Sequence, residues 1–440
     1  MSGSLPSSES ITRVELPNGI VVLGYETRGS PAQVIAGYLW AGAMDEPAEK
    51  AGLAYLTAAM LTHGTRRRTF AQINDELESV GAQLGFGSAT HHVSFGGKSL
   101  AEDLDLILDI LADCLQEPTF PEQEVTRLQG QILTDLQRRA HDTRRMARLT
   151  FDALLYPGHP YGRSVKGYEE TVSALSQPDL VAYYQDHYAP EGMVIAAVGS
   201  LPVEEVVRKV EASLGDWQAP GARPNRTIPP AVRLDEPRRQ IVAVEGKTQA
   251  DVVLGWPGLA RTDPEYMQVH LANTVLGTFG MMGRLGDNVR DEQGLAYYVF
   301  SRVEAGLGAG PWLATAGVNP ANVERAIDGI LSEVRRLRDE PVPADELADS
   351  QAYLTGIMPL QLETNEGVAN QLLNMERHGL GLDYLLHYGD LVKAVTVRDL
   401  QEMAGKYLDP ETYVLAVAGP AVDEEPVAEA SGVPEPEQAA

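Results

Sequence analysis

The sequence has very little cysteine: Cys114 is the single one among 440 residues. One thiol cannot form a disulfide within the chain, so the fold cannot depend on disulfide cross-links. Cys114 lies inside the apolar run 106–115. We therefore expect it to be a buried, small apolar residue rather than a reactive group.

Basic residues are also few, since 35 lysines and arginines stand against 62 aspartates and glutamates, a formal net charge of −27. Nucleic acids and anionic membranes both favour a basic surface, so this balance argues against either as a partner. One interpretation of the charge is an acidic chamber that attracts basic peptides. General surface acidity, which keeps a protein soluble, is the simpler interpretation and the one that the charge alone favours.

Long apolar runs are absent: none approaches the roughly 20 residues that a membrane-spanning helix needs. The first ten residues have neither the basic nor the apolar segment of a signal peptide. We therefore expect a soluble, cytoplasmic protein without a membrane span, and a periplasmic location stays open if a leader has been removed.

Several motifs of enzyme chemistry are missing as well. The sequence has no Walker loop, no dinucleotide fingerprint and no G-x-S-x-G nucleophile elbow. The nine histidines do not form a metal-binding pattern. His91 and His92 are neighbours on an expected strand and so point to opposite faces, and loop packing explains His159 better than metal ligation does.

Segments of the first half recur in the second half at a separation of about 220 residues, and a fixed separation of this kind marks a duplication. The recurring pairs are His187–Gly199 with Lys406–Gly419, Phe120–Glu124 with Val342–Glu346, and Ser94–Leu115 with Leu313–Leu337. They predict an α+β fold of two homologous domains, each an antiparallel sheet with helices packed on one side.

Composition sets the expected domain boundaries. A stretch rich in Pro, Arg and Gly shows neither helix nor strand periodicity, which is typical of a linker. The acidic, Pro- and Ala-rich end of the chain is expected to be disordered. The predicted organisation is a disordered lead 1–10, an N-terminal domain 11–215, a linker 216–237, a C-terminal domain 238–420 and a disordered tail 421–440.

The segment Gly52–Thr65 is the most informative stretch of the chain. It resembles the zinc helix of the M16 (insulinase/pitrilysin or mitochondrial processing peptidase) family, whose pattern is G-[LI]-A-H-x-x-E-H-M-L-x-x-G-T. The flanking residues are in register, but Tyr55, Ala58 and Ala59 stand where the family has its His, Glu and His. The third family ligand, a Glu on a later helix, is matched by the shorter Asp135. A catalytic zinc needs three protein ligands, so we expect this chain to hold no metal and no catalytic residues of its own.

A second resemblance lies in the other half, where 276–301 is similar to the family's S-R-L-x-x-x-x-R-[ED]-x-x-G-L-A-Y segment. The implied substrate-binding residues are Arg290 and Tyr297 (the R/Y pair), Arg284, and the loop glycines Gly277, Gly280 and Gly283. A tyrosine hydroxyl can stabilise an oxyanion, an arginine can clamp carbonyls, and glycines let a backbone approach the peptide. The alternative is that Tyr297 fills the core and Arg290 forms a surface ion pair.

In two-chain members of the family, one subunit carries zinc and the other supplies the R/Y pair and the glycine loop. The resemblance therefore implies a non-catalytic, substrate-binding subunit of a heterodimeric M16B-type peptidase, inactive alone and acting on unfolded peptides beside a zinc-bearing homologue. Two departures are that Gly283 replaces the serine of the S-R-L motif and that the glycine loop is less dense. The alternatives are a structural or peptide-binding homodimer and, third, an autonomous peptidase with a different metal site.

Overall fold

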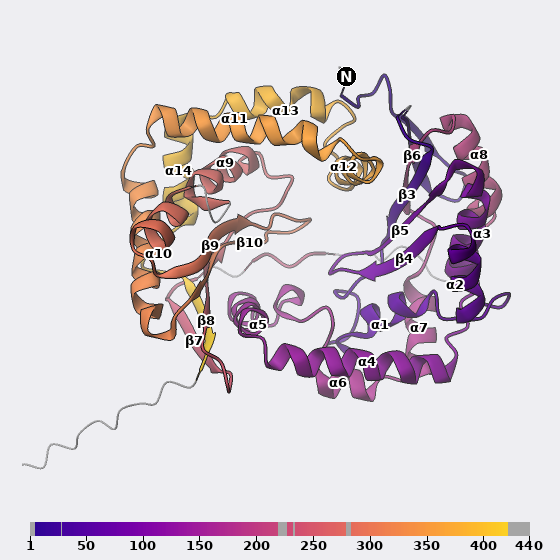
Figure 1. The fold of residues 1–440 in the computed structure, drawn as a ribbon, viewed down its shortest axis with the longest axis horizontal. Helices are drawn as coiled ribbons and strands as arrows, with labels where there is room; N and C mark the ends of the chain where they lie inside the picture. Colours follow the sequence, from indigo (N-terminus) through magenta and orange to yellow (C-terminus); the bar gives the residue numbers. More distant parts are fainter. Residues whose placement is uncertain (1–4, 28, 219–226, 232–233, 279–282, 421–440) are drawn as a thin grey trace, which may run out of the picture.

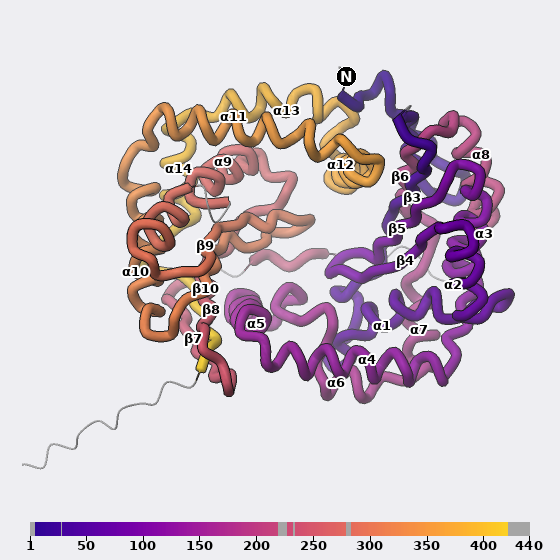
Figure 2. The backbone as a smooth tube through the Cα atoms, viewed as in Figure 1, coloured from indigo at the N-terminus to yellow at the C-terminus, as the bar shows by residue number. Residues whose placement is uncertain are grey.

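The computed structural model describes residues 5–27, 29–218, 227–231, 234–278 and 283–420. Two halves, each a sheet with its helices, face each other across the middle of the molecule (Figures 1 and 2). No helix in these ranges is long and apolar enough to cross a membrane. The predicted lead is partly ordered, because Ser8 N–H donates to Asp383 Oδ1 at 2.8 Å.

The first half is built on a six-stranded sheet with the order β1-β2-β6-β3-β5-β4. Its strands are β1 (Thr12–Glu15), β2 (Val21–Glu26), β3 (Ala32–Leu39), β4 (Gln83–Ser88), β5 (Val93–Leu100) and β6 (Val194–Gly199). The helices that follow these strands are α1 (Leu53–Met60), α2 (Phe70–Ser79), α3 (Leu104–Gln116), α4 (Glu122–Ala140), α6 (Glu169–Ala174), α7 (Gln177–His187) and α8 (Val203–Leu214).

The second half repeats this plan on a five-stranded sheet with the order β7-β11-β8-β10-β9. Its strands are β7 (Arg238–Ala243), β8 (Ala250–Pro257), β9 (Ala296–Val303), β10 (Pro311–Val318) and β11 (Val414–Gly419). Its helices are α9 (Tyr266–Gly277), the π-helix η4 (Gly286–Glu292), α10 (Val323–Asp339), α11 (Ala344–Gln361), α13 (Tyr384–Lys393) and α14 (Val397–Tyr407).

The predicted α+β fold of two similar domains is confirmed, with one difference in the sheets. Most strand pairs are antiparallel, but β2 runs parallel to β6 and β7 runs parallel to β11. The strands β6 and β11 occupy equivalent inner positions, and every residue of both is buried. Their uninterrupted apolar sequences fit a strand that is covered on both faces.

The second face of each sheet is covered by a helix from the opposite half, so the helices do not lie on one side only. Helix α5 (Thr143–Leu155) packs on β8 and β11, while α12 (Asn365–Arg377) packs on β3 and β6. In the first of these contacts, Phe151 joins a cluster that includes Val414. Each half therefore completes the core of the other, and this exchange fixes the cavity between them.

Candidate functional site

The degenerate motif begins at a glycine-dependent turn. Gly52 precedes α1 with φ 99°, and an added Cβ would meet the carbonyl oxygen of Lys166 at 3.0 Å. The Glu46 carboxylate accepts the N–H groups of Gly52 at 2.9 Å and Ala54 at 2.7 Å, which satisfies two free donors at the start of the helix. Burial raises the pKa of Glu46 to about 7. The retained flanking residues thus build the helix rather than a reactive group.

At Asp135, which matches the third ligand position of the family, the structure brings together a carboxylate and two cations. Asp135 Oδ2 accepts a hydrogen bond from Lys166 Nζ at 2.8 Å and another from Arg145 Nη2 at 3.0 Å. These bonds from Arg145 and Lys166 hold the pKa of the Asp135 carboxyl well below its usual range. The Lys166 ammonium also lies 5.4 Å from the centre of the Tyr55 ring. Cations occupy the surroundings of the one remaining carboxylate, so these residues do not fit a zinc ion.

No substitute metal site occurs in the described ranges, where no group of three His, Cys, Asp or Glu side chains could hold an ion. His63, which lies within the segment Gly52–Thr65, has its Nδ1 3.2 Å from Glu124 Oε2 and stacks on the Phe70 ring at 4.4 Å. His159 accepts the N–H of Tyr161 at 3.0 Å, and its Nε2 lies 3.0 Å from the carbonyl oxygen of Pro229. The packing role predicted for His159 fits these contacts.

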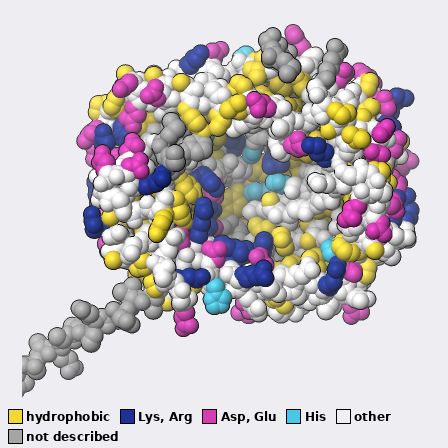
Figure 3. All heavy atoms as spheres, viewed as in Figure 1, with side chains coloured by type: hydrophobic (Ala, Val, Ile, Leu, Met, Phe, Trp, Pro, Cys, Tyr) yellow, Lys and Arg dark blue, Asp and Glu magenta, His cyan; other side chains and the backbone are white. Residues whose placement is uncertain are grey.

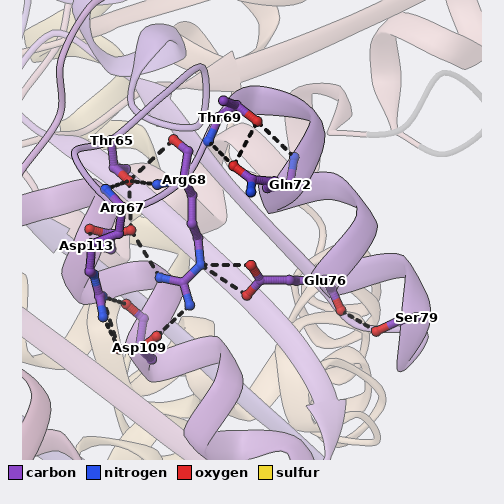
Figure 4. Close-up of polar contacts among 9 residues, drawn as sticks. All are labelled: Thr65, Arg67, Arg68, Thr69, Gln72, Glu76, Ser79, Asp109 and Asp113. Carbon is purple, nitrogen blue, oxygen red and sulfur yellow. Dashed lines mark hydrogen bonds and ion pairs between the residues drawn. The ribbon is translucent and has the colours of Figure 1, made fainter.

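Thr65, the last residue of the motif, makes structural contacts (Figure 4). Thr65 Oγ1 donates to Asp113 Oδ2 at 2.7 Å, and Arg68 Nη1 donates to the same oxygen at 3.0 Å. Asp113 is only 2% exposed, and the guanidinium of Arg67 satisfies its other oxygen at 3.0 Å. A buried carboxylate is tolerated when it is paired and hydrogen-bonded in this way. Thr65 therefore ties the loop after α1 to α3.

Tyr297 and Arg290 lie on neighbouring elements of the second half. Arg290 is on η4 and its Nε is 3.9 Å from Asp291 Oδ1, whereas Tyr297 is at the start of the edge strand β9. The pairing of β10 passes from Tyr298 to Ala296, which leaves Tyr297 as the extra residue of a β-bulge. Tyr297 is 78% exposed and so is not a core residue. Bulges of this kind often redirect a side chain near a functional site.

The other predicted substrate residues lie around the loop before η4. Arg284 is buried, and its Nε and Nη2 both donate to Glu346 at 2.8 Å, so its guanidinium is committed within the chain. Gly283 has φ 102°, and a Cβ there would come within 2.8 Å of the Cα of Gly277. This contact explains glycine at position 283, and the φ of 149° at Gly277 favours glycine there. Gly280 lies outside the described residues.

Sequence reasoning missed a second candidate site, a cavity of about 650 Å³ between the halves. Figure 3 shows the molecule hollowed at its centre, with Lys and Arg side chains gathered along the lower edge of the hollow. Arg145 and Lys166 line the cavity together with Glu304 from the second half, whereas Arg290 and Tyr297 are not part of that lining in the described structure. The formal net charge of −27 does not predict a cavity lined by basic residues such as Arg145 and Lys166.

The duplicated fold, the cavity between its halves and the altered metal helix define a two-domain, chamber-forming protein built on a metallopeptidase plan. Two models of one family match it: residues 26–167 match "Insulinase (Peptidase family M16)" and residues 174–354 match "Peptidase M16 inactive domain". The chain therefore belongs to peptidase family M16.

Named relatives and solved structures agree with this assignment. An uncharacterized zinc protease of Streptomyces coelicolor is 28% identical, covering 94% of this chain and 91% of the relative. The mitochondrial-processing peptidase subunit beta of Pongo abelii is 24% identical over 93% of this chain and 84% of its own length. The crystal structure of a peptidase M16 inactive domain from Pseudomonas fluorescens superposes with a TM-score of 0.86 at 25% identity, covering 94% of this chain and 98% of that one.

Proposed function

We propose that this chain is the non-catalytic, substrate-binding subunit of a heterodimeric M16B-type zinc peptidase. The observation that carries the proposal is the state of the metal helix. Tyr55, Ala58 and Ala59 offer no zinc ligand, and Asp135 is already bound by two cations. In this proposal the zinc belongs to a homologous partner subunit, and this chain completes the peptide chamber.

The exposed bulge residue supports a role in substrate contact. The Tyr297 side chain is 78% exposed, so it contributes little to the hydrophobic core. It can therefore contact a partner or a peptide without a cost to the core. The Tyr297 hydroxyl would donate to the oxyanion that develops on the attacked peptide carbonyl, and Arg290 would hold a second substrate carbonyl. In this arrangement Arg284, through Glu346, ties the start of η4 to α11.

The test is complementation with a zinc-bearing M16 homologue from the same source. We expect each chain alone to cleave a quenched fluorescent peptide slowly and the mixture to cleave it fast. Tyr297→Phe should lower the rate of the mixture by about a hundredfold, the usual effect of removing one oxyanion donor. The control is Tyr413→Phe, which removes the hydroxyl of a partly buried tyrosine directly before β11, away from the edge strand β9, and should leave the rate unchanged.

Two results would overturn the proposal. If the zinc-bearing chain alone reached the full rate, this chain would not be a subunit of the active enzyme. If the mixture were active and Tyr297→Phe behaved like Tyr413→Phe, the R/Y pair would have no part in the reaction.

A further inference from the structure

The cavity between the halves is lined by many more cations than carboxylates. Its charged lining residues are six basic ones, Arg139, Arg144, Arg145, Arg148, Arg163 and Lys166, against the two acidic ones Asp152 and Glu304. This excess occurs in a protein whose net charge is −27. A concave surface with one sign of charge concentrates ligands of the opposite sign.

Part of this charge is neutralised within the chain. Arg148 donates to Asp152 at 2.9 Å and, across the two halves, to Glu304 at 2.7 and 2.6 Å. Arg145 and Lys166 share the single carboxylate of Asp135. Glu304 also has the guanidinium of Arg302 3.7 Å away. The first group is therefore neutral, and the second carries one positive charge in excess.

The other three arginines make no ion pair with a carboxylate within the described ranges. Arg139 donates to Ser164 Oγ at 2.7 Å and to the carbonyl of Gly167 at 3.1 Å. Arg163 makes only long contacts, of 3.4 and 3.5 Å, with backbone carbonyls. The Arg144 guanidinium lies over the rings of Tyr298 and Phe300, 4.9 and 5.6 Å from their centres. The cavity therefore contains three arginines that no carboxylate of the described ranges contacts directly. The Glu46 carboxylate acts on Arg163, and those of Asp135 and Glu169 act on Arg139, at longer range.

We propose that this cavity is a subsite for an acidic peptide segment, whose carboxylates are bound by Arg139, Arg144 and Arg163. Guanidinium groups match carboxylates in a two-pronged geometry. Stacking on Tyr298 and Phe300 orients the Arg144 guanidinium before a ligand arrives. The subsite takes the place of the lost metal centre, because Arg145 and Lys166 belong both to the cavity wall and to the Asp135 cluster.

The rest of the lining favours a peptide over a small inorganic anion. Leu149, Val165 and Pro311 give the cavity apolar surface beside its charges, and Tyr156 and Tyr161 add two aromatic rings. A volume of about 650 Å³ falls within the range of sites that enclose organic ligands. A bare phosphate or a polyphosphate would leave this apolar surface unused.

The inference rests on the proposed function for its claim that the peptide is a substrate, but binding is a property of this chain alone. The experiment therefore uses the full chain without a zinc-bearing partner. Titration calorimetry would compare a glutamate-containing decapeptide with the same peptide carrying glutamine at those positions and an amidated end. We expect the acidic peptide to bind at least tenfold more tightly than the amide peptide. We also expect its binding to weaken as salt is added.

Substitutions locate the subsite. Arg144 is exposed, so Arg144→Gln should leave the fold intact. It should weaken the binding of the acidic peptide about tenfold or more, which is the usual effect of losing a charge-assisted hydrogen bond. Arg163→Gln should act in the same direction. The control Arg398→Gln removes the same charge from the outer surface, where the side chain is 86% exposed, and should have no effect.

The outcomes separate this inference from the proposed function. Equal binding of the acidic and amide peptides, equal effects of Arg144→Gln and Arg398→Gln, or binding of tripolyphosphate without binding of the acidic peptide would each overturn the subsite. A charge-dependent peptide site in a chain that adds no activity to a zinc-bearing homologue would preserve the subsite and overturn the proposed function.

Discussion

Restoring the family's ligands tests whether the cations around Asp135 replace the metal. The variant combines Tyr55→His, Ala58→Glu, Ala59→His and Asp135→Glu. If the absence of ligand side chains were the sole obstacle to zinc binding, this variant would bind zinc as tightly as a zinc-bearing relative does. We expect it to bind zinc weakly, and we expect Lys166→Gln, added to the four changes, to strengthen the binding.

The magnitude follows from the position of Lys166. Its Nζ is 2.8 Å from Asp135 Oδ2, and zinc lies about 2.1 Å from a carboxylate ligand. The ammonium would therefore be within about 5 Å of the ion, where repulsion is about 7 kcal/mol at an effective dielectric constant of 20 and about 2 kcal/mol in water. Because the Lys166 side chain is 38% exposed and can turn toward solvent, we adopt the smaller figure. It corresponds to about a thirtyfold difference in zinc affinity.

Competition titration with a chromophoric chelator would measure both affinities. Lys209→Gln in the same four-residue background is the control, because Lys209 pairs with Asp105 at 2.7 Å elsewhere in the first half. If Lys166→Gln and Lys209→Gln gave the same zinc affinity, the argument from charge would be refuted.

Two further predictions concern the free energy of unfolding. Phe151 is fully buried where α5 covers the second sheet, so Phe151→Ala should cost about 3–5 kcal/mol and shift one denaturant transition shared by both halves. A separate, unshifted transition of the second half would contradict the exchange of helices. The pKa of Glu46 is raised from 4.5 to about 7 by burial, so the folded chain holds this proton more tightly than the unfolded chain does. Stability should therefore fall as pH rises through that interval, by an amount on the order of 3 kcal/mol that Glu46→Gln abolishes; an equal slope in both proteins would disprove this account.

The duplication was readable from sequence because strand packing constrains residue type at every position. Buried inner strands such as β6 and β11 must be apolar throughout, and each is preceded by a similar helix and turn. The exchange of α5 and α12 was not readable. An apolar stripe, such as the one that includes Ala147 and Phe151, shows that a helix is buried but does not specify which sheet buries it.

The candidate site divides in the same way. The loss of zinc ligands follows from residue types at fixed positions of one helix, which the sequence displays directly. What replaces them depends on contacts between distant segments: Lys166 reaches Asp135 from 31 residues away, and nothing in its local sequence distinguishes it from a surface lysine. The bulge at Tyr297 likewise arises from the pairing of two strands, which a pattern within one strand cannot reveal.

The Asp135 cluster gives a physical reason why the helix that resembles the family's zinc helix would not need an ion. A zinc ion would place two positive charges beside the carboxylate of the third ligand position. Here Lys166 and Arg145 supply the same two charges from the protein itself. The carboxylate remains paired, so α1 and α4 keep their packing without an ion. The cavity wall also remains positive, and three more arginines extend it. The residue types found at the ligand positions of α1 are therefore compatible with the proposed binding of carboxylates at the same place, and both would suit the proposed substrate-binding subunit.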